Sequence, residues 1–407
     1  MNKRKRQAIG VSRWALAGYA SAIAMGLASL AGCESSTPEE TAPMTGGSGG
    51  AAGAAGSGGE VEDAGGTGGT APDAGPDGAA ATCTDEDIAA RDNANCQGEA
   101  SDYRSSDTAN DGWAACISDD GQYHPFDPNI SSIPRVGAFV QIAQLLRFGT
   151  DAVPTTQNFI DARLAYQTDQ GLESRVSRRE DEHYPKAPAA CNTLSASDLA
   201  AYPDRCVGPM KLQPILNDAF AAGITGEEPE KNAARIEAAL LWFLYASVYK
   251  EATSCATTAT DCDSGYAYYT GGEPRGGGLG LSHYVQIRSP QAHDRMWDGL
   301  LAMRCWRDLD NPTGAAQDPA RQNLARAQLD RALLRGVALI VRQRSEKAAC
   351  DGAWEFVRVL GPVLGREAAL RDSAAAQVLA TEVTKANGAE VNVDDLTSAI
   401  DTAFPCP

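Results

Sequence analysis

Ala238-Ala239-Leu240-Leu241-Trp242-Phe243-Leu244-Tyr245 is the stretch of this chain that decides its fold. It lies in a helical pattern that runs from Pro229, a residue favoured in the first turn of a helix, to about Glu251. The stretch is apolar on every side of such a helix, whereas a surface helix has a single apolar face. We therefore expect this helix at the centre of the folded domain.

The sequence on both sides of this stretch is also helical in pattern. Apolar residues recur at steps of three and four, and no run of alternating β-branched residues has the length of a strand. Further helices are expected at 133–148, 157–178, 212–222, 291–306, 319–347, 352–359, 366–386 and 393–404. The pattern predicts an all-α domain, a multi-helix up-and-down bundle array with long disulfide-stapled loops at 83–132, 179–207 and 253–289.

The cysteines indicate an exported protein. An even number of them follows residue 33, and no C-x-x-C motif suggests a redox pair or a zinc ribbon. The spacing favours the bridges Cys191–Cys206 and Cys255–Cys262, together with a bridge from Cys116 or Cys305 to Cys406. The cysteines expected to form disulfides are Cys83, Cys96, Cys116, Cys191, Cys206, Cys255, Cys262, Cys305, Cys350 and Cys406.

The N-terminus resembles the leader of a bacterial lipoprotein. Five basic residues and no acid accompany an apolar segment, 14–30, that is too short and too rich in Ala and Gly for a comfortable membrane span. Leu30-Ala31-Gly32-Cys33 closes it and resembles the lipobox, which implies that 1–32 is a signal peptide and that Cys33 is acylated. Glu34 stands where an Asp would suggest inner-membrane retention, which favours the outer membrane. The alternative is a secreted protein with a coincidental cysteine.

Residues 33–82 have the composition of a disordered tether. They are Gly, Ala, Ser, Thr, Pro and acidic residues, and such a segment buries too little surface to offset its chain entropy. The remaining 83–407 form the helical, disulfide-rich domain, in which 45 acidic residues face 30 basic ones, a net charge of −15. This charge disfavours nucleic acid as a partner and leaves the acyl chains as the contact with the membrane.

A candidate metal site is the run Glu180, Asp181, Glu182 and His183, which offers carboxylate oxygens and an imidazole. The alternative is a solvated charge run at the end of a helix. A separate basic row, Arg331, Arg335 and Arg342, could bind an anion or pair with acids of neighbouring helices.

A candidate ligand site is the segment from Cys255 to Tyr284, which we expect to form a mobile aromatic lid over a pocket. Its alternative is a stapled surface loop, and its glycine run lacks the Lys-Ser/Thr of a phosphate loop. Glu237 lies on the apolar helix and is expected either buried with a raised pKa or at the helix's wet edge. Convergence on one cavity would favour a ligand site. The candidate ligand-binding residues are Glu237, Asp261, Asp263, Tyr266, Tyr269 and His283.

The sequence contains no motif that assigns a reaction. It has no G-x-S-x-G and no H-E-x-x-H, and with four histidines a Ser-His-Asp set would need distant assembly. No motif requires a cofactor.

The helix from Ala233 to Glu251, followed by Asp263-Ser-Gly-Tyr266-Ala-Tyr268-Tyr269, resembles a segment of the imelysin-like exported proteins. The resemblance implies a helical bundle associated with iron or haem acquisition, although the group's G-x-H-x-x-E motif is absent. The sequence therefore predicts a lipid-anchored helical domain of the cell envelope that binds a small ligand or a protein partner. The alternatives are an exported hydrolase that uses 255–284 and a structural surface lipoprotein without a small-molecule site.

Overall fold

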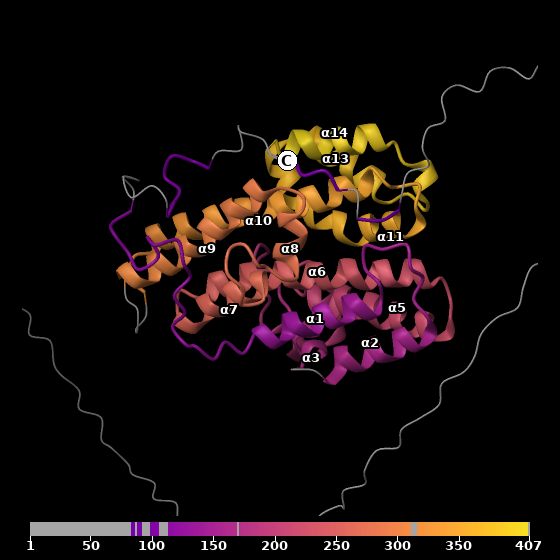
Figure 1. Ribbon diagram of the computed structural model, residues 1–407, viewed down its shortest axis with the longest axis horizontal. Coiled ribbons are helices and arrows are strands. Elements are labelled where there is room, and N and C mark those ends of the chain that lie inside the picture. Colours follow the sequence, from indigo (N-terminus) through magenta and orange to yellow (C-terminus); the bar gives the residue numbers. More distant parts are fainter. Residues whose placement is uncertain are drawn as a thin grey trace, which may run out of the picture. The chain divides into compact units, whose positions relative to one another are not determined.

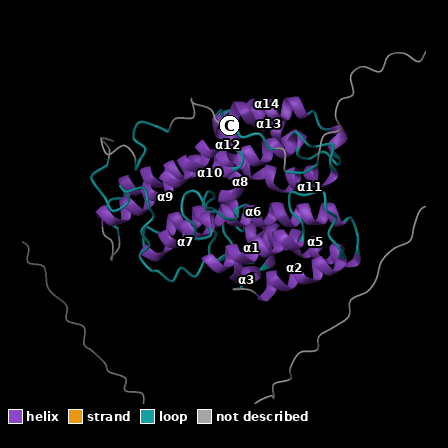
Figure 2. Cartoon of the chain, viewed as in Figure 1, coloured by secondary structure: helices purple, strands orange, loops and turns teal. Residues whose placement is uncertain are grey.

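The computed structural model describes residues 83–85, 88–91, 98–105, 113–168, 171–310 and 316–405. All of them belong to one compact unit, Pro76–Pro407. Within these ranges the regular structure is entirely helical, and no strand occurs (Figure 2). The expected all-α class is therefore confirmed, while the leader 1–32, Cys33 and the tether 33–82 lie outside the described residues.

The described helices are packed into an array that follows the chain order (Figure 1). The α-helices are α1 (Ile133–Leu145), α2 (Thr156–Thr168), α3 (Leu172–Val176), α4 (Ala196–Ala200), α5 (Gln213–Thr225), α6 (Pro229–Ser254), α7 (Ala259–Thr270), α8 (Leu281–Gln286), α9 (Pro290–Asp310), α10 (Pro319–Ser345), α11 (Asp351–Leu360), α12 (Gly365–Arg371), α13 (Ser373–Glu382) and α14 (Val393–Ala403). Short 3-10 or π turns are η1 (Cys191–Thr193), η2 (Gly208–Leu212), η3 (Gly361–Leu364) and η4 (Gly388–Glu390).

Helix α6 is the centre of this array, as its apolar stretch predicts. It contacts α5, α7, α10 and α11. In Figure 1, α1, α2, α5 and α7 lie below it, and α10, α11, α13 and α14 lie above it. Every side chain from Leu240 to Tyr245 is buried. Burying a large apolar side chain contributes about 1.5–3 kcal/mol, so this stretch holds both groups of helices together.

Two expected helices are interrupted. The pattern at 157–178 divides into α2 and α3, and α3 begins after Gly171, whose φ of 70° lies in the left-handed region. The pattern at 366–386 divides at Asp372, whose backbone is extended and whose side chain accepts a hydrogen bond from the N–H of Ala375 as the N-cap of α13. Gly171 and Asp372 both have non-helical backbone conformations, and each directly precedes the start of a new helix.

The connection at 253–289 is not an irregular loop, so that prediction is wrong. It contains α7 and α8, and only 271–280 between them lacks helix. Gly265 and three tyrosines weaken the intrinsic helix propensity of α7. Packing against α6 outweighs that weakness, and most of the residues of α7 are buried.

Four disulfides join the described cysteines. Cys191–Cys206 and Cys255–Cys262 confirm the pairs expected from spacing, and Cys83–Cys350 ties the start of the domain to the start of α11. Cys116 bonds to Cys305, with a Cα–Cα distance of 5.6 Å, so the expected bridge from either of them to Cys406 is wrong. Cys96 and Cys406 lie outside the described residues.

Disulfides are typical of proteins that fold outside the cytoplasm, and four of them are consistent with that location for this chain. Among the described helices, none has both the length and the apolar character needed to cross a bilayer.

Candidate functional site

Two cavities lie on either side of one tight turn, Arg147–Thr150, which follows α1. The turn forms because Arg147 and Gly149 both adopt left-handed backbone conformations, with φ of 59° and 72°. The N–H of Phe148 donates to the carbonyl of Ala143, and the N–H of Thr150 donates to that of Arg147. The chain therefore reverses within four residues and presents them to both cavities.

The larger cavity, which we call the apolar groove, has a volume of about 700 Å³. It lies between α1 and α8, and most of its lining surface is apolar. This size is within the range of small-molecule sites, which are mostly apolar with a few polar groups. Besides the turn and Asp85, its lining residues are Phe139, Val140, Ala143, Gln144, Leu279, Gly280, His283, Tyr284 and Ile287.

The smaller cavity, which we call the polar pocket, has a volume of about 300 Å³. It lies where the first half of α6 meets the start of α11 and the Cys83–Cys350 disulfide. Small residues of both helices, Ala233, Ala234 and Gly352, leave the space open. Glu237 and Arg344 are its buried charged residues.

A cluster of buried charges, Asp85, Glu237, Arg288 and Arg344, contributes to both cavities. Arg344 donates to Asp85 Oδ2 at 2.9 Å and to Glu237 Oε1 at 2.8 Å, and Arg288 donates to Asp85 Oδ2 at 3.1 Å. The hydroxyl of Tyr284 donates to Glu237 Oε1 at 2.7 Å. We call these four charged residues the ion cluster.

The two carboxylates of the ion cluster have opposite pKa shifts. Burial would raise the pKa of Asp85, but Arg344 and Arg288 outweigh it and hold that pKa below its usual value. Burial raises the pKa of Glu237, and Arg344 opposes this effect without cancelling it. Asp85 is therefore the firmly ionised partner of the two arginines, and Glu237 is the carboxylate whose charge depends more on its surroundings.

The segment 83–85 carries Asp85 into the ion cluster. Cys83 is bonded to Cys350, the N–H of Asp85 donates to the carbonyl of Gly149 at 2.8 Å, and Lys347 donates to the carbonyl of Thr84. Asp85 is thus fixed by a disulfide on one side and by the turn on the other, which limits how far it can move from the arginines.

Of the residues predicted from the sequence, Glu237 and His283 line the cavities, one in each. Glu237 is 2% exposed, which confirms the buried alternative. Burial and the charge of Arg288 hold the pKa of His283 below its usual value, so its imidazole is neutral at neutral pH. Their role in binding stays a prediction.

Asp261, Asp263, Tyr266 and Tyr269 line neither cavity. Asp263 accepts the N–H groups of Phe126 and Asp127 at 2.9 Å, and it holds the 113–132 segment against α7. Burial raises the pKa of Asp261, which lies on the first turn of the same helix. These residues therefore do not converge with Glu237 and His283 on one cavity, the arrangement that would have favoured a single ligand site.

The expected aromatic lid is also wrong, because its tyrosines are packed in the interior. Tyr266 stacks on Tyr123 with ring centroids 4.1 Å apart, and its hydroxyl donates to the carbonyl of Gly272. Tyr269 is fully buried, with its hydroxyl 3.1 Å from Nδ1 of His293. These contacts fix α7 in place.

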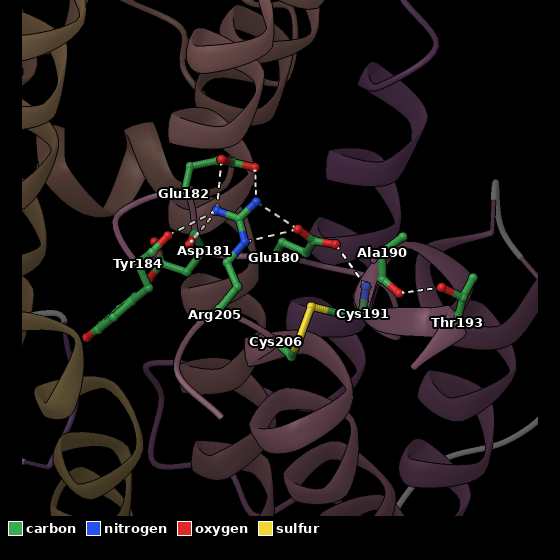
Figure 3. Close-up of a disulfide and its surroundings, with 9 residues drawn as sticks. All are labelled: Glu180, Asp181, Glu182, Tyr184, Ala190, Cys191, Thr193, Arg205 and Cys206. Carbon is green, nitrogen blue, oxygen red and sulfur yellow. Dashed lines mark hydrogen bonds and ion pairs between the residues drawn. A yellow bond between two sulfur atoms is a disulfide. The ribbon is translucent and has the colours of Figure 1, made fainter. Parts of the chain in front are cut away.

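The side chains of the run Glu180–His183 are bound by other residues of the protein. Arg205 donates to Glu180 at 2.7 Å and to Glu182 at 2.7 Å, beside the Cys191–Cys206 disulfide (Figure 3). His183 lies between Asp181, 2.6 Å from Nδ1, and Asp330, 2.9 Å from Nε2. Burial lowers the pKa of His183, but these two hydrogen bonds outweigh it and raise the pKa to about 9. A protonated imidazole has no lone pair for a metal.

One further group of potential ligands occurs in the described ranges, formed by Cys116, Asp119 and Cys305. Its two sulfur atoms are bonded to each other, so they offer no thiolate to a metal. The basic row on α10 pairs largely with acids, since Arg331 contacts Asp102 at 2.5 Å and Arg342 contacts Asp401 at 2.6 Å.

Asp85, Arg288 and Arg344 were not among the residues predicted from the sequence. All three are remote in sequence from Glu237. One available signal was that Asp85 lies two residues after Cys83, so a disulfide at that cysteine would fix its position. The fully buried Arg288 had no such signal.

No protein-family profile matches this chain, and neither a curated protein nor a solved structure matches it.

Proposed function

We propose that this protein is a lipid-anchored binding domain of the outer membrane that holds a small, largely apolar molecule in the apolar groove. The groove itself is the observation that carries the proposal, because it combines about 700 Å³ of space with a mostly apolar lining surface. The neutral imidazole of His283 adds a polar group that can donate or accept a hydrogen bond.

Support for the anchor comes from the sequence. The lipobox that ends at Cys33 would attach the acyl chains, and the tether 33–82 would separate the domain from the bilayer. Mass spectrometry of the native protein tests this part. The expected mature chain begins at an acylated Cys33, and an intact leader would contradict the anchor.

The groove is tested with the fluorescent apolar anion 1-anilinonaphthalene-8-sulfonate. We expect saturable binding to the wild type and at least tenfold weaker binding to Ala143→Trp, in which the indole occupies the groove. Leu370→Trp is the matched control, because residue 370 is 71% exposed on α12 and lines neither cavity. Equal binding by both variants would contradict the groove and would favour a structural surface lipoprotein.

Iron or haem is the alternative ligand that the imelysin-like resemblance implies. Stoichiometric iron in the native lipoprotein, or a haem absorption band, would favour that ligand over an apolar metabolite. The hydrolase alternative relied on an irregular segment 255–284, and α7 and α8 occupy most of that segment. We therefore do not extend the proposal to hydrolysis.

A further inference from the structure

The polar pocket contains a buried carboxylate with an unused acceptor. Both hydrogen bonds to Glu237 end on Oε1, one from Tyr284 and one from Arg344. Within the described part of the chain, Oε2 accepts no hydrogen bond, and it is not among the fully enclosed unpartnered atoms. Since Glu237 is 2% exposed and lines the pocket, Oε2 presents its acceptor to the pocket.

The pocket also has an unpaired positive group. Arg147 lines it from the turn after α1, and no described residue forms an ion pair with its guanidinium. Its backbone is left-handed, with a φ of 59°, a conformation that few residues other than Gly, Asn and Asp adopt without cost. The backbone conformation at residue 147 thus favours Gly, Asn or Asp, whereas the residue there is an arginine that lines the pocket.

Most of the other charges of the pocket are compensated. Glu230 and Asp351 lie in the first turns of α6 and α11, where a carboxylate offsets the positive end of the helix. Asp351 also contacts Lys231 at 3.3 Å, and Arg344 is shared between Asp85 and Glu237. Asp151 lines the pocket as well, but it is exposed to solvent. The buried group left to recognise a ligand is thus the carboxylate of Glu237, and the cation left is Arg147.

We propose that the polar pocket binds a free amino acid or a similar small zwitterion, with its ammonium group on Glu237 Oε2 and its carboxylate on Arg147. An ammonium supplies the donor that Oε2 lacks, and a carboxylate accepts two hydrogen bonds from a guanidinium. The volume of about 300 Å³ lies at the lower end of small-molecule sites, which suits a ligand of this size.

This site is separate from the apolar groove, and neither proposal depends on the other. The turn Arg147–Thr150 stands between them, and Ala143 lines only the groove. Amino acid binding should therefore be retained in Ala143→Trp, the variant in which the groove is filled.

The test begins with thermal unfolding of the wild-type domain in the presence of each standard L-amino acid. At least one is expected to raise the melting temperature, and calorimetry then gives its affinity. Removing either charged group from that ligand should weaken binding at least tenfold. For leucine, the matched compounds would be isoamylamine, which lacks the carboxylate, and 4-methylpentanoate, which lacks the ammonium.

Two variants locate the site. Glu237→Gln removes the carboxylate, and Arg147→Asn removes the guanidinium while placing a residue that tolerates the left-handed backbone. Each is expected to weaken binding at least tenfold. Glu251→Gln is the control, because it makes the same change on the same helix at a buried carboxylate outside the pocket. If Glu237→Gln fails to fold, Arg147→Asn decides alone.

The proposal is overturned if no amino acid raises the melting temperature of the wild type. It is also overturned if Arg147→Asn binds as tightly as the wild type, or if the amine alone binds as tightly as the amino acid.

Discussion

At the scale of single residues, His183 shows how this protein keeps a charge inside. Its side chain is 3% exposed and is enclosed by two carboxylates and by the ring of Tyr249, with centroids 3.6 Å apart. An isolated buried cation would be costly, but hydrogen bonds from both ring nitrogens to Asp181 and Asp330 stabilise the imidazolium.

This arrangement makes stability depend on pH in the alkaline range. The folded-state pKa of His183, about 9, is above the unfolded value of 6.5. The protonated imidazole therefore contributes fully below pH 6.5, and the contribution is lost as pH rises through 9. The difference is on the order of 3 kcal/mol. Urea unfolding across this range should show the loss in the wild type.

The change His183→Gln should remove this part of the pH dependence. His124→Gln is the control, because His124 forms a half-exposed pair with Asp120, and exposed ion pairs contribute little to stability. An unchanged pH profile in His183→Gln would show that the imidazolium does not carry the effect.

The sequence indicated His183 and Glu237 as unusual, but it could not indicate their partners. Asp330 is 147 residues from His183, and Arg344 is 107 residues from Glu237. Local spacing shows which residue types lie near one another along a helix. It does not show which charges meet when distant helices pack. For this reason the run Glu180–His183, which the sequence predicted as a metal site, forms a network of ion pairs with Arg205 and Asp330 instead.

At the scale of elements, the turn Arg147–Thr150 positions the candidate site. It ends α1, separates the two cavities and accepts the backbone of Asp85 through the carbonyl of Gly149. A side chain at residue 149 would be strained for two reasons. The φ is 72°, and an added Cβ would lie 3.1 Å from Asp85 Oδ2.

Gly149→Ala should therefore destabilise the domain by about 1–3 kcal/mol, since the left-handed backbone alone costs about 1–2 kcal/mol. Gly137→Ala is the control on the adjacent helix α1, because a Cβ there meets nothing within 4 Å. This control should stabilise the domain by about 0.5–1 kcal/mol. Urea unfolding measures both, and equal effects would contradict the proposed role of the turn.

The helices were predictable where their apolar pattern is strong. The expected bounds of α6, α9 and α10 are within four residues of those observed. The apolar residues of these long helices recur at helical spacing and not at the alternating spacing of a strand. Helix α7 was not predictable in the same way. Its tyrosines and Gly265 are poor helix formers in isolation, and contacts with α6 determine its conformation.

At the scale of the whole molecule, disulfides join parts of the domain that are distant in sequence. Cys83–Cys350 spans 267 residues and Cys116–Cys305 spans 189, whereas Cys255–Cys262 spans 7. The short bridges were predictable from spacing because each closes a local loop. The long ones depend on how the first described residues pack against α9 and α11, which no local pattern reveals.

The bridge Cys83–Cys350 is expected to matter most for both stability and the candidate site. A cross-link stabilises mainly by restricting the unfolded chain, and the effect grows with the length of the closed loop. Replacing both cysteines by serine should cost about 4 kcal/mol, against about 2 kcal/mol for the same change at Cys255–Cys262. The expected measurement is the free energy of unfolding in urea for the two double variants.

The same variant pair separates the general effect of a cross-link from a local effect on the ion cluster. Without Cys83–Cys350, the segment that carries Asp85 is held by the hydrogen bond from Lys347 to Thr84 and by the contacts of Asp85 with Gly149, Arg288 and Arg344. Hydrogen exchange should then increase at Arg288, which follows the end of α8, and in the last turns of α10, which contain Arg344. The variant at Cys255–Cys262 should leave exchange at these arginines unchanged. Equal losses of stability and unchanged exchange in both variants would show that the segment carrying Asp85 is held by packing alone.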